Sequence, residues 1–168
     1  AQFVTNSAQC ISPELIEYLS FNLKELKSGT PFFYLVGGRE FWSLDLEVNQ
    51  DVLIPRPESE LLVEKASEIA KKKGKVLELG TGSGAISIAL AKERPDLNIV
   101  ATDISLKALK VAQRNVNRHR CEIELIAADW FQGLKNNWDL IISNPPYISK
   151  DDPHLFDLRK EPNLALIA

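Results

Sequence analysis

The sequence predicts an α/β fold in which a parallel sheet is covered by helices. Short apolar runs alternate with helical stretches from Lys75 onward, which is the order expected of such a sheet. A glycine-rich turn, Gly80 to Gly84, joins the first run to the first of these helical stretches. Polar residues follow several apolar runs, so ligand-binding groups should gather at the carboxyl edge of the sheet.

The first predicted element is a helix that begins near Ser12 and ends at Ser28-Gly29. Ser12 can cap its start, and Pro13 suits the first helical position. Four leucines follow at helical spacing: Leu15, Leu19, Leu23 and Leu26. We expect this apolar face to pack on the core.

Residues 31–57 predict a β-hairpin that links this helix to the main domain. Residues 44–48 alternate apolar and polar side chains, which is strand periodicity with one buried face. Residues 49–51 are typical of a turn, and 52–54 should form the returning strand.

The remaining elements belong to the main domain. A helix is expected at 59–73, where three lysines at its end complement the helix dipole and Gly74 stops it. The predicted strands are 76–79, 98–101, 122–126 and 140–143, and the predicted helices between them are 85–92 and 106–117. Helices should cover both faces of the sheet.

Composition narrows the class of protein. The chain has 168 residues, 45% apolar and 26% charged, as expected of one globular core with a small appended unit. A net charge of −3 disfavours binding along a phosphate backbone, so no direct sequence-specific nucleic-acid binding is expected. We expect a cytoplasmic protein, because no apolar run approaches a membrane span and no signal peptide pattern is present. Cys10 and Cys121 should be reduced thiols, and their spacing predicts no metal site.

The glycine-rich turn is the predicted cofactor loop. Gly80, Thr81, Gly82, Ser83 and Gly84 lie between a strand and a helix, so backbone N–H groups can approach a ligand closely. Asp103 ends the next predicted strand, where a carboxylate can accept hydrogen bonds from both ribose hydroxyls of a nucleoside.

The identity of the cofactor depends on Glu78. The pattern Gly80-x-Gly82-x-x-Ala85 also fits a dinucleotide fingerprint, so NAD or FAD and a plain tight turn stay open as alternatives. A carboxylate two residues before the loop would repel a pyrophosphate, whereas it suits a ligand that carries an ammonium and a sulfonium. The pattern therefore favours S-adenosylmethionine. Asp129 could hold the adenine amino group and Trp130 could cover the ring, although a buried core tryptophan is the commoner case.

The tetrapeptide Asn144-Pro145-Pro146-Tyr147 predicts the chemistry. Asn144 offers a side-chain carbonyl, and the two prolines fix a backbone whose carbonyls can point outward. Tyr147 adds a flat face. Together these groups can grip a planar –NH2 by both hydrogens, which directs the nitrogen lone pair and favours methyl transfer by alignment. The alternative is a rigid turn after a strand.

These motifs together resemble the release-factor glutamine methyltransferases, which methylate a glutamine side-chain amide in peptide chain release factors. The resemblance runs from about Pro31 onward. It covers 38–42, 52–60, 77–84, 129–131, 143–148, 152–155 and 161–166, of which the Ile54-Pro-Arg-Pro-Glu58 stretch is the most specific.

The resemblance implies a Rossmann-like methyltransferase domain that uses S-adenosylmethionine in translation termination. It implies cofactor binding by Gly80 to Gly84, Asp103, Trp130 and Asn144, and it implies that 144–147 hold the glutamine of a Gly-Gly-Gln tripeptide. We place a partial helical, substrate-engaging segment at 1–36, a hairpin linker at 37–57 and the catalytic domain at 58–168. The family's helical and catalytic domains are both longer, and the chain contains no methionine, so we expect further sequence beyond these residues.

Two other functions stay open at this point. An N6-adenine methyltransferase acting on DNA or RNA would share the tetrapeptide, and the acidic balance of the chain disfavours it. A cofactor-binding scaffold without turnover would have no need of an amine-gripping motif.

Overall fold

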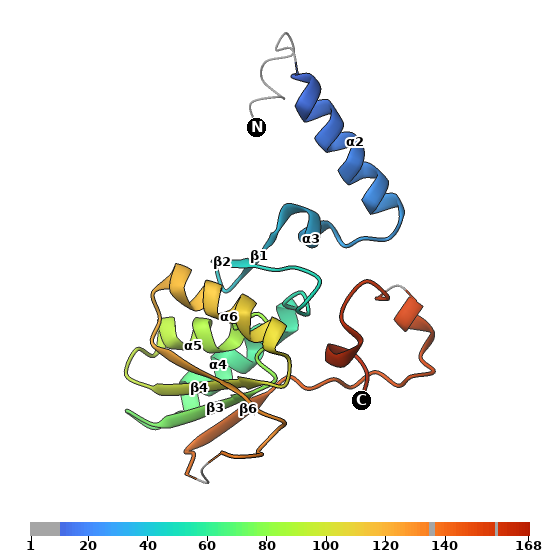
Figure 1. The fold of residues 1–168 in the computed structure, drawn as a ribbon. Helices are drawn as coiled ribbons and strands as arrows, with labels where there is room; N and C mark the ends of the chain where they lie inside the picture. Colours follow the sequence, from blue (N-terminus) through green and yellow to red (C-terminus); the bar gives the residue numbers. More distant parts are fainter. Residues whose placement is uncertain (1–10, 135–136, 157) are drawn as a thin grey trace.

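The structure is a computed structural model that describes residues 11–134, 137–156 and 158–168. Its centre is a four-stranded parallel sheet in the order β5-β4-β3-β6 (Figure 1). The strands are β3 Lys75–Leu79, β4 Asn98–Asp103, β5 Ile123–Ala127 and β6 Leu140–Ser143. The predicted strands are thereby confirmed to within two residues at each end.

Three helices cover one face of this sheet: α4 Glu60–Ile69, α5 Ala85–Glu93 and α6 Leu106–His119. Their apolar side chains pack with Val76, Ile99 and Ile142 in the largest core cluster. The opposite face carries Leu77, Leu79 and Val100, and the partly buried side chains on it are those of Ile126, Leu134 and Trp138. Within the described residues, helices therefore cover only one face of the sheet. The prediction that they cover both faces was wrong.

Helix α4 is shorter than predicted. It ends at Ile69, and Ala70 is extended. Two of the three lysines beyond it make tertiary contacts instead of lying in its last turn. Lys71 Nζ lies 2.9 Å from Asp139 Oδ1, and the Lys73 N–H donates to Asp96 Oδ2 at 2.8 Å.

The hairpin is present with a different pairing. Strand β1 Gly38–Phe41 pairs antiparallel with β2 Leu44–Glu47 through a two-residue turn, Trp42-Ser43. Both turn residues have positive φ, 52° and 56°, a geometry usually marked by Asn or Gly. The sequence carries no such signal at residues 42–43, so this turn was not predicted. Residues 52–54 form no strand, and the expected returning strand was therefore wrong. The predicted turn at 49–51 is confirmed by a hydrogen bond from the Asp51 N–H to Asn49 Oδ1.

A buried side chain anchors the hairpin to helix α6 and the glycine loop. Asn115 of α6 is fully buried and accepts a hydrogen bond from the Glu47 N–H at 2.7 Å. Its Nδ2 donates to the Glu47 and Ser83 carbonyls at 3.0 and 2.9 Å. One amide thus joins strand β2, helix α6 and the glycine loop.

The N-terminal helix forms as predicted but does not pack as predicted. Helix α2 Pro13–Lys27 begins at Ser12, whose Oγ accepts from the Leu15 N–H at 3.3 Å. None of its residues is buried, and it extends away from the sheet (Figure 1). Its expected core-facing role was therefore wrong. Cys10 lies outside the described residues.

Shorter elements connect these parts. Helix α3 Phe32–Val36 precedes the hairpin, and single 3-10 turns occupy η1 Pro57–Ser59, η2 Pro153–Phe156 and η3 Asn163–Ala165. None of the helices in the described residues has the length and apolar character that a membrane crossing requires.

Candidate active site

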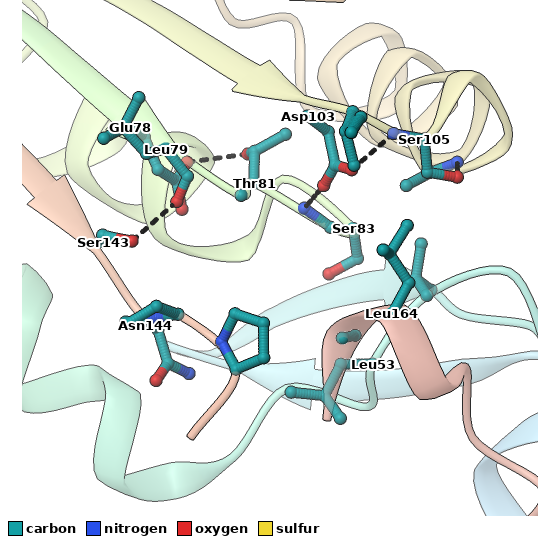
Figure 2. Close-up of a pocket in the computed structure, with 18 of the residues that line it drawn as sticks. Leu53, Glu78, Leu79, Thr81, Ser83, Asp103, Ser105, Ser143, Asn144 and Leu164 are labelled. Carbon is teal, nitrogen blue, oxygen red and sulfur yellow. Dashed lines mark hydrogen bonds between the residues drawn. The ribbon is translucent and has the colours of Figure 1, made fainter. Parts of the chain in front are cut away.

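A cavity of about 600 Å³ opens at the carboxyl ends of β3, β4 and β6 (Figure 2). That size lies within the range of small-molecule sites. Most of the predicted site residues line it: Glu78, Gly80, Thr81, Gly82, Ser83, Asp103, Asp129, Trp130, Asn144, Pro145 and Pro146. Gly84 and Tyr147 are not among the lining residues.

The glycine loop has the strand-to-helix setting that the sequence predicts. Gly80, Gly82 and Gly84 all have positive φ, between 57° and 83°. A Cβ at Gly84 would lie 3.1 Å from Ile88 Cδ1 and 3.4 Å from Ala112 Cβ, so this glycine allows α5 and α6 to approach each other. Its role is packing, which explains its absence from the cavity.

Glu78 combines a cavity position with deep burial. Its side chain is 2% exposed and accepts hydrogen bonds from the hydroxyls of Thr81, at 2.7 Å, and Ser87. Burial raises the pKa of Glu78 to about 7, against the lowering effect of the two hydroxyls, and the charge of Asp103 adds to the rise. The site therefore holds a carboxyl that would ionise more readily beside a cation.

Asp103 ties the glycine loop to the end of β4. Its Oδ2 accepts from the Gly82 N–H and its Oδ1 from the Ser105 N–H, both at 2.9 Å (Figure 2). Each carboxylate oxygen keeps a second lone pair, so hydrogen bonding to ligand hydroxyls stays possible.

Asp129 and Trp130 follow strand β5 and both line the cavity. The Trp130 side chain is about half exposed, at 51%, and its φ is 51°. Asp129 Oδ2 accepts from Gln132 Nε2 at 3.0 Å. Trp130 is therefore not a core residue, and its proposed contact with an adenine ring remains a prediction.

Asn144 lies directly after β6, on the opposite side of the cavity from Asp103 (Figure 2). Its Nδ2 donates to Ser59 Oγ at 3.2 Å, and the neighbouring Ser143 Oγ donates to the Leu79 carbonyl at 3.1 Å. Tyr147 is 75% exposed, so its flat face is turned to solvent here.

Sequence reasoning did not identify a further wall of the cavity. Leu53, Pro55 and Ser59 line it from the segment after the hairpin, and Leu164 and Ile167 line it from the C-terminal segment. Arg56 of the segment after the hairpin also lines it. Two stretches of the family resemblance, 52–60 and 161–166, fall on this wall, but neither was assigned to the site. No three His, Cys, Asp or Glu side chains in the described part of the chain are grouped to hold a metal.

Comparison with known proteins identifies the family. Residues 57–156 match the family model of the methyltransferase small domain. The chain belongs to this methyltransferase family.

Curated relatives agree with the resemblance seen in the motifs. Release factor glutamine methyltransferases from Escherichia coli K12 and Neisseria gonorrhoeae are 44% and 39% identical over 94% and 98% of this chain. One from Bordetella pertussis is 46% identical over 83% of it. The chain spans 59%, 62% and 54% of the lengths of these relatives. The resemblance is thereby confirmed.

Solved structures confirm the Rossmann-like methyltransferase fold. A Thermus thermophilus 16S rRNA N2 G1207 methyltransferase in complex with AdoMet and guanosine aligns with a TM-score of 0.57 at 21% identity, over 67% of this chain and 33% of that one. A Pyrococcus abyssi tRNA (uracil-54, C5)-methyltransferase aligns at 0.55 and 23%, over 65% and 28%. These alignments concern the fold alone.

Proposed function

We propose that this cavity binds S-adenosylmethionine and that the protein methylates the side-chain amide of the glutamine in the Gly-Gly-Gln motif of release factors. One observation carries the proposal. The glycine loop and Asn144-Pro145-Pro146 line the same cavity, so a cofactor group and an amide-gripping group share one space. A cofactor-binding scaffold would not require that arrangement.

The residues present fit this cofactor. A Cβ built on Gly80 or Gly82 would meet no heavy atom within 4 Å, so open space lies over the loop. Glu78 and Asp103 place carboxyl groups beside that space, which suits a ligand with two cationic centres and two ribose hydroxyls and disfavours a pyrophosphate. When bound, S-adenosylmethionine supplies an electrophilic methyl group on its sulfonium.

The chain's own contribution is to hold and orient the acceptor nitrogen. Because Asn144 Nδ2 is engaged by Ser59, we assign Oδ1 to accept one N–H of the substrate amide. The Pro145 carbonyl is assigned to accept the other. Two acceptors fix the direction of a weakly nucleophilic amide, and their dipoles stabilise the positive charge that develops on its nitrogen.

The substrate class rests on the relatives. Those in Escherichia coli, Neisseria gonorrhoeae and Bordetella pertussis are named for release factors. We propose the same partner here, in the cytoplasm, with no direct sequence-specific nucleic-acid binding. In this proposal residues 1–36 engage the release factor, residues 37–57 link this segment to the main domain, and residues 58–168 catalyse the methyl transfer.

The test offers a purified release factor and adenine-containing DNA, side by side, to the full chain with radiolabelled S-adenosylmethionine. Label on the release factor, lost when its Gly-Gly-Gln glutamine is replaced, is the expected result. Label on DNA alone would identify an adenine methyltransferase. Binding without label on either substrate would indicate a scaffold.

A further inference from the structure

The cavity has a wall that neither the glycine loop nor the tetrapeptide supplies. Leu53, Pro55 and Arg56 line it from the linker, and Pro162 and Leu164 line it from the C-terminal segment. Figure 2 shows Leu53 and Leu164 reaching toward the cavity from these two segments. The shape of the site therefore depends on how two remote parts of the chain are held together.

One buried carboxylate joins them. Glu161 is 5% exposed, and its Oε2 accepts a hydrogen bond from the Ile54 N–H at 3.1 Å. Its Oε1 accepts from Arg56 Nη2 at 2.5 Å, although Arg56 stands 105 positions earlier in the chain. Both oxygens are thus used, one by the linker backbone and one by a linker side chain.

The segment that follows Glu161 is fixed at its other end as well. The Ile148 N–H donates to the Leu166 carbonyl at 2.9 Å, and the Ala168 N–H donates to the Ile148 carbonyl at 3.1 Å. Ile148 lies just beyond the tetrapeptide. Leu164 is therefore held between the linker and the segment that follows the tetrapeptide.

We propose that Glu161 is a positioning residue, which fixes this wall against the bound cofactor without touching the reacting atoms. The role rests on the proposed function. The Glu161 carboxylate is buried, whereas the Arg56 side chain is 35% exposed. Because ion pairs often add little net stability, we assign the value of this pair to the geometry it imposes. Small displacements of positioning groups cost large factors in binding and rate.

The test measures S-adenosylhomocysteine affinity and amide hydrogen exchange in the full chain. Glu161→Gln should raise the Kd at least about tenfold and speed exchange at Ile54 and at 166–168, because the charged acceptor is lost. Arg56→Lys is the second variant, for the case that Glu161→Gln does not fold, and should raise the Kd about threefold or more. Glu47→Gln is the matched control. It removes the Glu47–Arg114 ion pair between hairpin and α6, outside the cavity, and should change neither readout.

The outcomes separate this inference from the function on which it rests. Unchanged exchange in both variants would overturn the holding role of Glu161. Faster exchange with an unchanged Kd would overturn its positioning role. If the wild-type chain does not bind S-adenosylhomocysteine, the proposed function fails and the positioning role falls with it, while exchange still reports whether Glu161 holds the wall.

Discussion

Glu78 is a buried carboxyl whose surroundings disfavour its charged form. A carboxyl with a pKa near 7 binds a proton in the folded protein over a range where the unfolded chain, with a value of 4.5, has lost it. The folded state therefore binds more protons between about pH 4.5 and 7, and the contribution of Glu78 to stability falls as pH rises through that window. A cationic ligand beside Glu78 would stabilise its carboxylate and so offset the unfavourable free energy of ionising this buried group.

Cofactor affinity should consequently rise as pH increases through about 7. From pH 6 to pH 8 we expect S-adenosylmethionine to bind about tenfold more tightly, with proton release at pH 6, because ionised Glu78 pairs with the cation. Calorimetry in two buffers of different ionisation enthalpy measures the released proton. Glu78→Gln should flatten the profile, and Glu124→Gln, an exposed carboxyl on β5, should not. A wild-type profile without proton release would argue against contact between Glu78 and the cation.

Asn144 should matter for turnover more than for cofactor affinity. Asn144→Ala removes the proposed acceptor for the substrate N–H, so kcat should fall at least about 100-fold. The cofactor Kd should change by no more than about threefold. Steady-state kinetics and calorimetry check the two quantities separately. Equal losses in both would contradict the assigned role.

At the scale of elements, α5 and α6 approach closely only because Gly84 has no side chain. In Gly84→Ala the new Cβ would be strained by the positive φ of this position and would lie 3.1 Å from Ile88 Cδ1. The unfolding free energy should therefore fall by about 2–4 kcal/mol. Gly133→Ala has a similar φ of 78° and no atom within 4 Å, so it should cost only about 1 kcal/mol. Urea titration of both compares packing with backbone strain. A similar loss in the two variants would show that packing contributes nothing.

The hairpin should depend on Asn115. Asn115→Ala leaves the partly buried backbone groups of Glu47 and the buried Ser83 carbonyl without their partner, which should lower unfolding free energy by about 2–4 kcal/mol. Asn117→Ala, two residues further along α6 at an exposed position, should change it by less than about 0.5 kcal/mol. Chemical denaturation measures both. Wild-type stability in Asn115→Ala would show that the hairpin is held by other contacts.

Local pattern predicted those elements whose boundaries are set locally. Strand β6 and the start of α5 were predicted to the residue, because apolar runs and a glycine turn mark them. The end of α4 was missed because Lys71 pairs with Asp139, 68 positions away. The cavity residues at strand ends were predictable from parallel topology. The cavity wall that Glu161 holds to the linker was not predictable, because Glu161 and its partners Ile54 and Arg56 are more than 100 positions apart.

At the scale of the whole molecule, the sheet and its cavity form one body from which α2 extends (Figure 1). Helical periodicity identified an apolar face on α2, but it could not identify what that face contacts. Leu19 and Leu23 are 45% and 57% exposed in the described structure. The sheet with its cavity and the N-terminal helix thus differ sharply in how completely they are packed.

One cavity should bring the methyl donor to a gripped glutamine amide. The most direct test is mass spectrometry of a release factor incubated with the full chain and S-adenosylmethionine, with fragmentation to locate the added methyl group. We predict a single methyl group on the side-chain nitrogen of the Gly-Gly-Gln glutamine, and none when the enzyme carries Asn144→Ala. A methyl group on any other residue, or an equal yield from the Asn144 variant, would contradict this account.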